Sequence, residues 1–146
     1  MGAARIFFLF LALGAIALTP MLEARPDVPT APHDEMAAAR VARVLQRSAP
    51  GRSSAIGSGR SMEPLYGDGT VLLFQRVPFS ELEAGMVVAF KDRFGQTVTH
   101  ELVTRSGYGW VTKGRGNRHA DRGRVTAENL VGVVYLVLYT GETAGD

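Results

Sequence analysis

The sequence predicts a mainly β fold, and three observations support this expectation. From residue 70 onward, apolar and β-branched residues recur in short alternating runs, which is typical of strands. Glycine-containing turn signals separate several of these runs, and only one earlier segment has the 3.6-residue periodicity of a helix. The predicted strands cover residues 70–75, 86–91, 96–104, 109–113 and 130–139, and the predicted hairpin turns cover residues 93–95 and 106–109.

Residues 1–24 are expected to form a signal anchor or a signal peptide. Arg5 precedes an unbroken apolar run over residues 6–18, which is shorter than the roughly 20 residues of a full membrane span and fits a secretory signal. Leu22, however, occupies the position before a cleavage site that prefers a small residue, which favours an uncleaved anchor. In both cases the rest of the chain is expected to be exported.

Residues 25–54 are expected to form a linker and an amphipathic helix. Residues 25–32 contain three prolines, and Asp34 is placed to cap a helix over residues 35–47. Apolar residues are predicted on one face and arginines on the other: Ala38, Val41, Val44 and Leu45 against Arg40, Arg43 and Arg47. Such a helix either lies on anionic lipid or packs on the domain, and the sequence leaves both open.

The remaining segments complete the predicted organisation. Residues 48–60 are rich in Gly, Ser and Arg and are expected to form a loop. Short helical turns are predicted over residues 79–83 and 126–129, the second capped by Thr126. We expect one domain over residues 55–140 and a tail over residues 141–146.

Composition excludes several functional classes. The 146 residues include no cysteine, so disulfides, thiolate metal sites and a cysteine nucleophile are all excluded. The net charge of +2 is too small to argue for nucleic-acid binding, and none is expected.

Three polar residues are of the types needed for nucleophilic catalysis. Ser61 lies between a glycine-rich approach and Pro64, where a sharp turn can leave its hydroxyl exposed. His100 alternates with Val98 and Leu102 in a predicted strand, and Asp121 follows in a loop. A hydroxyl, an imidazole and a carboxylate are a nucleophile, a base and a group that orients the base.

Each of these residues also has an ordinary structural interpretation. Serines are common in turns, a histidine on an apolar face is often a core residue, and Asp121 can pair with Arg122 or Arg124. Lys113 is an alternative base, because serine–lysine pairs also activate nucleophiles. The spacing of His100, His119 and Asp121 matches no metal-ligand motif, so no metal site is expected. No other motif implies a cofactor.

Taken together, the motifs resemble the type I signal peptidase family over about residues 55–138. Six segments carry the resemblance in the family's order: Ser61-Met62-Glu63-Pro64, Gly67-Asp68, Gly85-Met86-Val87-Val88, His100-Glu101-Leu102-Val103, Gly116-Asn117 to Asp121, and Gly132-Val133-Val134. The histidine at position 100 is similar to the archaeal and endoplasmic-reticulum branch, whereas the common bacterial branch has a lysine in that strand.

The resemblance implies a signal-peptidase-like β-fold with Ser61 as nucleophile, His100 as base and Asp121 as orienter. It also implies that Met62, Pro64 and Ser58 bind substrate. The chain departs from the branch at three positions. Glu101 stands where an arginine is usual, Gly114-Arg115-Gly116-Asn117 stands where Gly-Asp-Asn is usual, and Gly59 stands where a serine often helps to hold the oxyanion.

The expected function is that of a membrane-associated serine endopeptidase. It would cleave signal peptides or similar exported segments of secreted and membrane preproteins after small residues. Its catalytic domain would lie on the extracytoplasmic side of the cell membrane in contact with lipid, or be secreted after signal cleavage. The alternatives are a maturation protease dedicated to one client, with the same chemistry, and a catalytically inactive β-domain that binds peptides.

Overall fold

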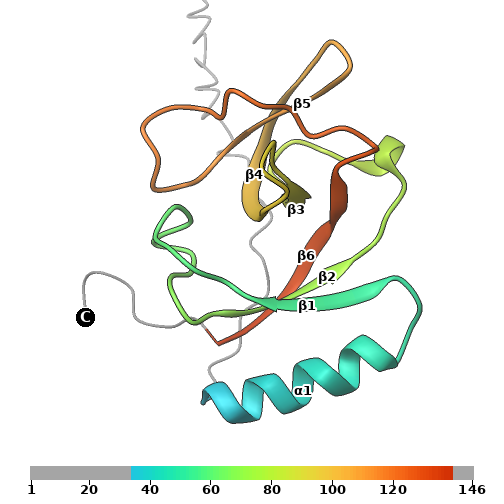
Figure 1. Ribbon diagram of the computed structural model, residues 1–146, viewed down its shortest axis with the longest axis vertical. Helices are drawn as coiled ribbons and strands as arrows, with labels where there is room; N and C mark the ends of the chain where they lie inside the picture. The colour runs from blue at the N-terminus through green and yellow to red at the C-terminus, as the bar shows by residue number, and fades with distance from the viewer. Residues whose placement is uncertain (1–33, 140–146) are drawn as a thin grey trace, which may run out of the picture.

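The computed structural model describes residues 34–139, which form one helix and one sheet (Figure 1). The elements are α1 (Glu35–Arg47), β1 (Arg52–Ile56), β2 (Val71–Gln75), η1 (Phe79–Glu81), β3 (Val87–Lys91), β4 (Thr97–Ser106), β5 (Gly109–Lys113) and β6 (Leu130–Tyr139). The predicted leader over residues 1–24, most of the linker and the tail lie outside the described residues. Among the described helices, none is long and apolar enough to cross a membrane.

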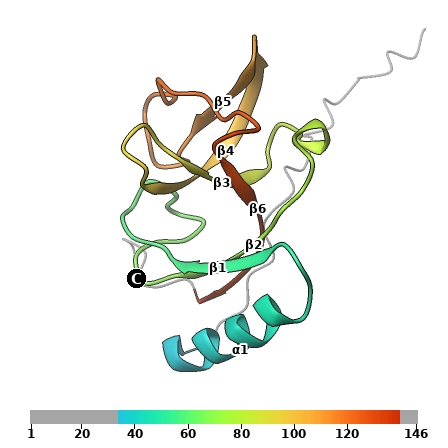
Figure 2. The same cartoon turned by 45° about the vertical axis from the view of Figure 1, so that its right-hand side comes forward.

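All strand pairs are antiparallel, and the sheet order is β1-β2-β6-β3-β4-β5. The last strand in the sequence, β6, therefore lies between β2 and β3 and joins two hairpin-like halves. Register shifts interrupt the β2–β6, β3–β6 and β4–β5 pairings, and such irregularities bend strands and increase their twist. As Figures 1 and 2 show, β1 and β2 lie near the helix while β5 lies at the opposite end of the molecule. The prediction of a mainly β fold is confirmed.

Apolar side chains fill both faces of the sheet. Val87 and Ala89 pack with Phe74, Tyr66 and Met62 in one cluster. The alternate residues of β3, Val88 and Phe90, pack in a second cluster with Leu102, Trp110 and Val125. Because successive side chains of a strand point to opposite faces, these clusters lie on opposite sides of β3.

Helix α1 begins and ends where the sequence predicted, and the Oδ1 atom of Asp34 accepts a hydrogen bond of 2.8 Å from the backbone N–H of Ala37. The predicted apolar face is partly wrong. Ala38 and Ala42 are the buried residues, whereas Val41 and Val44 are exposed. Small alanine side chains let the helix approach β2 and β6 closely.

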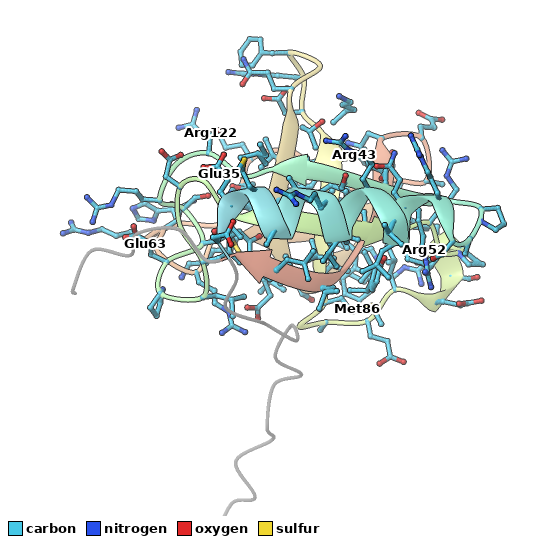
Figure 3. The ribbon with its side chains drawn as sticks, turned by 90° about the horizontal axis from the view of Figure 1, so that it is seen from below. Glu35, Arg43, Arg52, Glu63, Met86 and Arg122 are labelled. Carbon is cyan, nitrogen blue, oxygen red and sulfur yellow. The ribbon has the colours of Figure 1, made fainter. Side chains whose placement is uncertain are left out.

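The helix thus packs on the domain through the cluster that contains Val71, Leu73 and Leu138. Arg43 lies on its outer side (Figure 3), where Arg40, Arg43 and Arg47 surround the exposed side chain of Val44. Contact of this outer side with lipid stays a prediction.

Two local predictions are wrong. Residues 52–56 were expected in a loop but form β1, because pairing with β2 and contact with α1 stabilise a segment whose own sequence is polar and small. Residues 127–129 do form a turn, closed by a 3.1 Å hydrogen bond from the N–H of Leu130 to the carbonyl of Thr126, but the predicted cap is wrong: the Oδ1 atom of Asn129 accepts a 2.7 Å hydrogen bond from the N–H of Thr126. The other predicted helical turn forms as η1, two residues shorter than expected.

Leu73 is fully buried between helix and sheet, so its truncation should destabilise the whole domain. Leu73→Ala is expected to lower the free energy of unfolding by about 2–5 kcal/mol, measured by urea denaturation. Val44→Ala, at a residue that is 68% exposed, is the control and should change it by less than about 0.5 kcal/mol. Equal effects of the two substitutions would contradict the packing described for α1.

Candidate active site

Ser61 lies in the long connection between β1 and β2. The ends of this connection are held together by backbone hydrogen bonds from Gly57 to Thr70 (2.7 Å) and from Gly69 to Gly57 (3.1 Å). Gly59 has a φ of 89°, a conformation that favours glycine, and its N–H donates to the Oδ1 atom of Asp68 (3.0 Å). The predicted turn around Ser61 therefore forms, and Asp68 shapes it.

Met62 fixes this connection to the core. Its side chain is only 2% exposed and packs in the cluster with Phe74 and Val87. Contact of Met62 with substrate stays a prediction, and because the core already surrounds its side chain, such contact would involve the backbone. Pro64 and Ser58 are exposed on the same connection, so they are accessible to a bound peptide. The peptide bond between Glu63 and Pro64 is cis.

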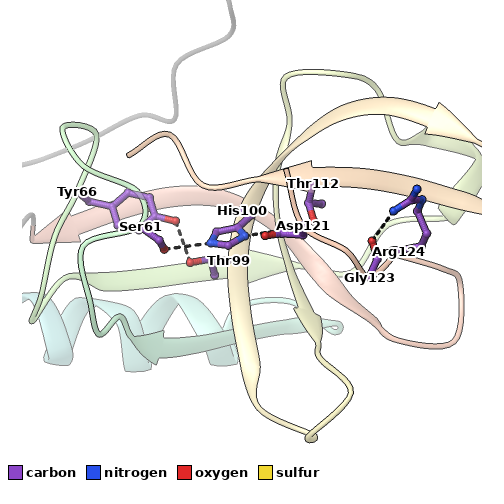
Figure 4. A network of polar contacts seen from close by, with 8 residues as sticks. All are labelled: Ser61, Tyr66, Thr99, His100, Thr112, Asp121, Gly123 and Arg124. Carbon is purple, nitrogen blue, oxygen red and sulfur yellow. Dashed lines mark hydrogen bonds and ion pairs between the residues drawn. The ribbon is translucent and has the colours of Figure 1, made fainter. Parts of the chain in front are cut away.

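His100 lies on β4 between the serine and the aspartate (Figure 4). Its Nε2 atom lies 3.0 Å from the Oγ atom of Ser61, and its Nδ1 atom lies 2.6 Å from the Oδ2 atom of Asp121. A carboxylate can only accept, so Nδ1 carries the proton. In the neutral ring Nε2 is then an acceptor aimed at the serine hydroxyl. The His100 side chain is 8% exposed, and the ring of Phe90 contacts the imidazole edge-on at 6.4 Å between centroids.

Asp121 is held by the end of β5. Its backbone N–H donates to the carbonyl of Thr112 (2.8 Å), and its Oδ2 atom accepts a 2.6 Å hydrogen bond from the Thr112 hydroxyl. Partial burial acts to raise the pKa of Asp121, but hydrogen bonds from His100 and Thr112 outweigh it and hold the pKa below its usual value. Asp121 therefore stays ionised at neutral pH and can stabilise a protonated imidazole.

The glycine-rich segment after β5 packs directly against the serine. The N–H of Gly116 donates to the carbonyl of Ser61 (2.9 Å). A Cβ atom on Gly114 would lie 2.4 Å from that carbonyl oxygen and 3.0 Å from the Nε2 atom of His100. Only a residue without a side chain fits at position 114.

The structure brings Ser61, His100 and Asp121 together and excludes the simpler interpretation of Asp121 as a surface ion-pair residue. No ion pair joins Asp121 to Arg122 or Arg124 within residues 34–139, and Arg124 instead donates to the carbonyl of Gly123 (2.9 Å; Figure 4). Among the same described residues no group accepts a hydrogen bond from the backbone N–H of Ser61, which leaves that donor available to an oxyanion.

The structure supports neither Lys113 as the base nor a metal site at His100, His119 and Asp121. Lys113 follows Thr112 in β5, so its side chain points to the opposite face from the Thr112 hydroxyl that contacts Asp121. His119 is exposed, and no cluster of His, Asp and Glu able to hold a metal ion occurs in the part of the chain that the structure describes.

Sequence reasoning missed the supporting residues Thr112, Gly114 and the Glu101–Arg115 ion pair. Thr112 lies two residues before Gly114, near the end of β5, and contacts Asp121 only because of the path of the loop after β5. The two glycines flanking Arg115 were the one available signal of close packing.

This arrangement can activate the serine hydroxyl for attack on a carbonyl carbon. The neutral imidazole accepts a hydrogen bond from the accessible hydroxyl, and an ionised carboxylate orients the imidazole.

Comparisons of the chain with protein-family models, with curated proteins and with solved structures found no match.

Gly114→Ala should disrupt the site because the added methyl group collides with backbone at Ser61. We expect at least about a 10²-fold loss of reaction of Ser61 with a fluorophosphonate probe, as expected when reacting groups are displaced by ~1 Å. Gly123→Ala is the matched control, since a Cβ atom there meets nothing within 4 Å. An unchanged labelling rate in Gly114→Ala would show that the segment moves away freely.

Thr112→Val should make stability less dependent on acid pH. The lowered pKa of Asp121 stabilises the fold above the pKa of the unfolded chain, and this stability is lost as pH falls through the folded pKa. Removing the Thr112 hydroxyl raises that pKa, so the variant should be less stable than the parent at neutral pH, and the difference should shrink towards about pH 2.

Urea denaturation across this pH range measures the effect. Thr70→Val is the control, because the Thr70 hydroxyl is equally buried but has no hydrogen-bond partner among the described residues. A Thr112→Val deficit that stays constant with pH would contradict the assigned bond to Asp121.

Proposed function

We propose that the protein is a serine endopeptidase of the signal peptidase type. The observation that carries the proposal is the continuous chain of contacts from Ser61 Oγ through His100 to Asp121, built from three separate segments of the sequence. The mainly β architecture and the order of the motifs support the same assignment. The sequence resemblance supplies the substrate class, which is the signal peptides of secreted and membrane preproteins.

In the proposed reaction, the Oγ atom of Ser61 attacks the scissile carbonyl while Nε2 of His100 takes the hydroxyl proton. The new C–O bond gives a tetrahedral oxyanion, which the backbone N–H of Ser61 stabilises. The imidazolium then gives its proton to the leaving amine as the C–N bond breaks, leaving an acyl-enzyme. Water, deprotonated by His100, hydrolyses the ester and restores Ser61.

Each supporting residue has a definite part in this scheme. The ionised Asp121 favours the imidazolium that forms in both steps, and its bond to Nδ1 keeps Nε2 facing the serine. Burial of the imidazole on β4 limits competing hydrogen bonds from water. The exposed Ser58 and Pro64 border the nucleophile, and an extended peptide is expected to bind beside them with small residues at the first and third positions before the cut.

The proposed location is the extracytoplasmic face of the cell membrane. It depends on the apolar run over residues 6–18, which is expected to act as an anchor. There the catalytic domain would meet preproteins as they emerge.

The central test compares three alanine substitutions in the full chain. Ser61→Ala should abolish cleavage of a peptide with alanine at the first and third positions before the cut, a loss of at least about 10³-fold in kcat. His100→Ala should have a similar effect, whereas Lys113→Ala should retain most activity because its side chain lies on the other face of β5. Circular dichroism checks that each variant is folded.

Two outcomes would overturn the proposal. Normal cleavage by Ser61→Ala would exclude this site as the source of activity, and an active His100→Ala beside an inactive Lys113→Ala would reverse the assignment of the base. Failure of the folded parent chain to react with either peptide or fluorophosphonate would favour a peptide-binding domain without catalysis.

A further inference from the structure

The residue after the proposed base carries a buried charge. Glu101 is 7% exposed, and its Oε2 atom accepts a hydrogen bond of 2.9 Å from the Nε atom of Arg115. The side chains are only 9% and 23% exposed, respectively, so this ion pair is largely removed from water. Burying a carboxylate is costly unless it is paired.

Both partners are one residue away from groups that form the site. Glu101 follows His100 on β4. Arg115 lies between Gly114, which packs on the Ser61 carbonyl and on His100 Nε2, and Gly116, whose N–H donates to that carbonyl. The ion pair therefore connects the strand that carries the imidazole to the segment that contacts the nucleophile.

A second ion pair, between Arg60 and Glu63, differs from the Glu101–Arg115 pair in its exposure to solvent. Arg60 and Glu63 lie on the nucleophile connection itself with an N–O distance of 3.0 Å, but the side chain of Arg60 is 67% exposed. Such surface pairs contribute little to structure. The Glu101–Arg115 pair, by contrast, links β4 to the segment after Lys113, where the pairing of β4 with β5 has ended.

We propose that Glu101 and Arg115 are positioning residues for the reaction proposed above, on which this inference rests. The pair holds residues 114–117 against Ser61, and so maintains the distance from Ser61 Oγ to His100 Nε2 and keeps the Ser61 N–H directed at substrate. Neither side chain has to touch the substrate for this role.

The test measures two properties in the purified full chain. The first is the second-order rate of labelling of Ser61 by a fluorophosphonate probe. The second is hydrogen exchange of the Gly116 amide, which reports its bond to the Ser61 carbonyl and does not depend on catalysis. The variants are Arg115→Met, Glu101→Gln, their double variant, and the charge exchange Glu101→Arg with Arg115→Glu.

Arg52→Met is the matched control. Arg52 is also half-buried and also donates through Nε, to Gln75 at 3.1 Å, but it lies on β1 outside the site. It should lower the melting temperature while leaving the labelling rate and Gly116 exchange unchanged. A purely structural role for Arg115 would give the same pattern as this control.

We expect Arg115→Met and Glu101→Gln each to slow labelling by about 10–100-fold, the size associated with small displacements of reacting groups. Gly116 exchange should become faster in both. The double variant should be no slower than the slower single variant, because coupled residues are not additive. The charge exchange should restore labelling to within about threefold of the parent.

Three results would overturn the inference. The first is that Arg115→Met has the same labelling rate and the same Gly116 exchange as Arg52→Met. The second is that the losses of the two single variants add in the double variant. The third is that the charge-exchanged variant folds but labels no faster than the single variants. A parent chain that does not label at all contradicts the proposed function instead. Gly116 exchange then still decides whether the pair holds the segment.

Discussion

Strand β6 is the element on which the arrangement of the site depends. It pairs with β2 on one side and with β3 on the other, while β2 and β3 do not pair with each other. The serine belongs to the β1–β2 half, and the histidine and aspartate belong to the β3–β4–β5 half. The last strand of the sequence must therefore be in place before Ser61 and His100 are held at a fixed distance.

Close backbone contact adds to the positioning of Ser61 that the sheet provides. Segment 114–117 leaves β5 and reaches across to the carbonyl of Ser61, and only glycine fits at its first position. On the other side, the buried side chains of Met62 and Tyr66 fix the connection that carries the serine to the core. The Ser61 hydroxyl is thus left accessible on a backbone that is held from both sides, which is a general requirement for a preorganised site.

The charges of the site divide into two groups with different roles. Asp121 is partly exposed and stays ionised through its hydrogen bonds to Thr112 and His100, so its charge is available to the imidazole. Glu101 is more deeply buried and forms an ion pair with Arg115, which lies on the segment after β5. In the proposed reaction, one carboxylate would assist the proton transfer, and the other would maintain the geometry in which the transfer takes place.

The sequence by itself determined the β-class of the fold, the position of α1 with its Asp34 cap, and the three chemical groups of the site, because periodicity, capping and motif order are local signals. It did not determine β1, whose polar residues form a strand only against β2, nor the burial of Ala42 in place of Val44, which depends on how closely the helix approaches the sheet.

Tertiary structure alone decided which polar residues meet. Thr112 reaches Asp121, and Arg115 reaches Glu101, through a loop whose path no local pattern specifies. It also decided that Lys113 lies away from the serine, since the face of β5 on which a residue lies follows from strand register. Contacts between segments distant in sequence depend on the register and bending of the whole sheet, and these are set by packing over many residues at once.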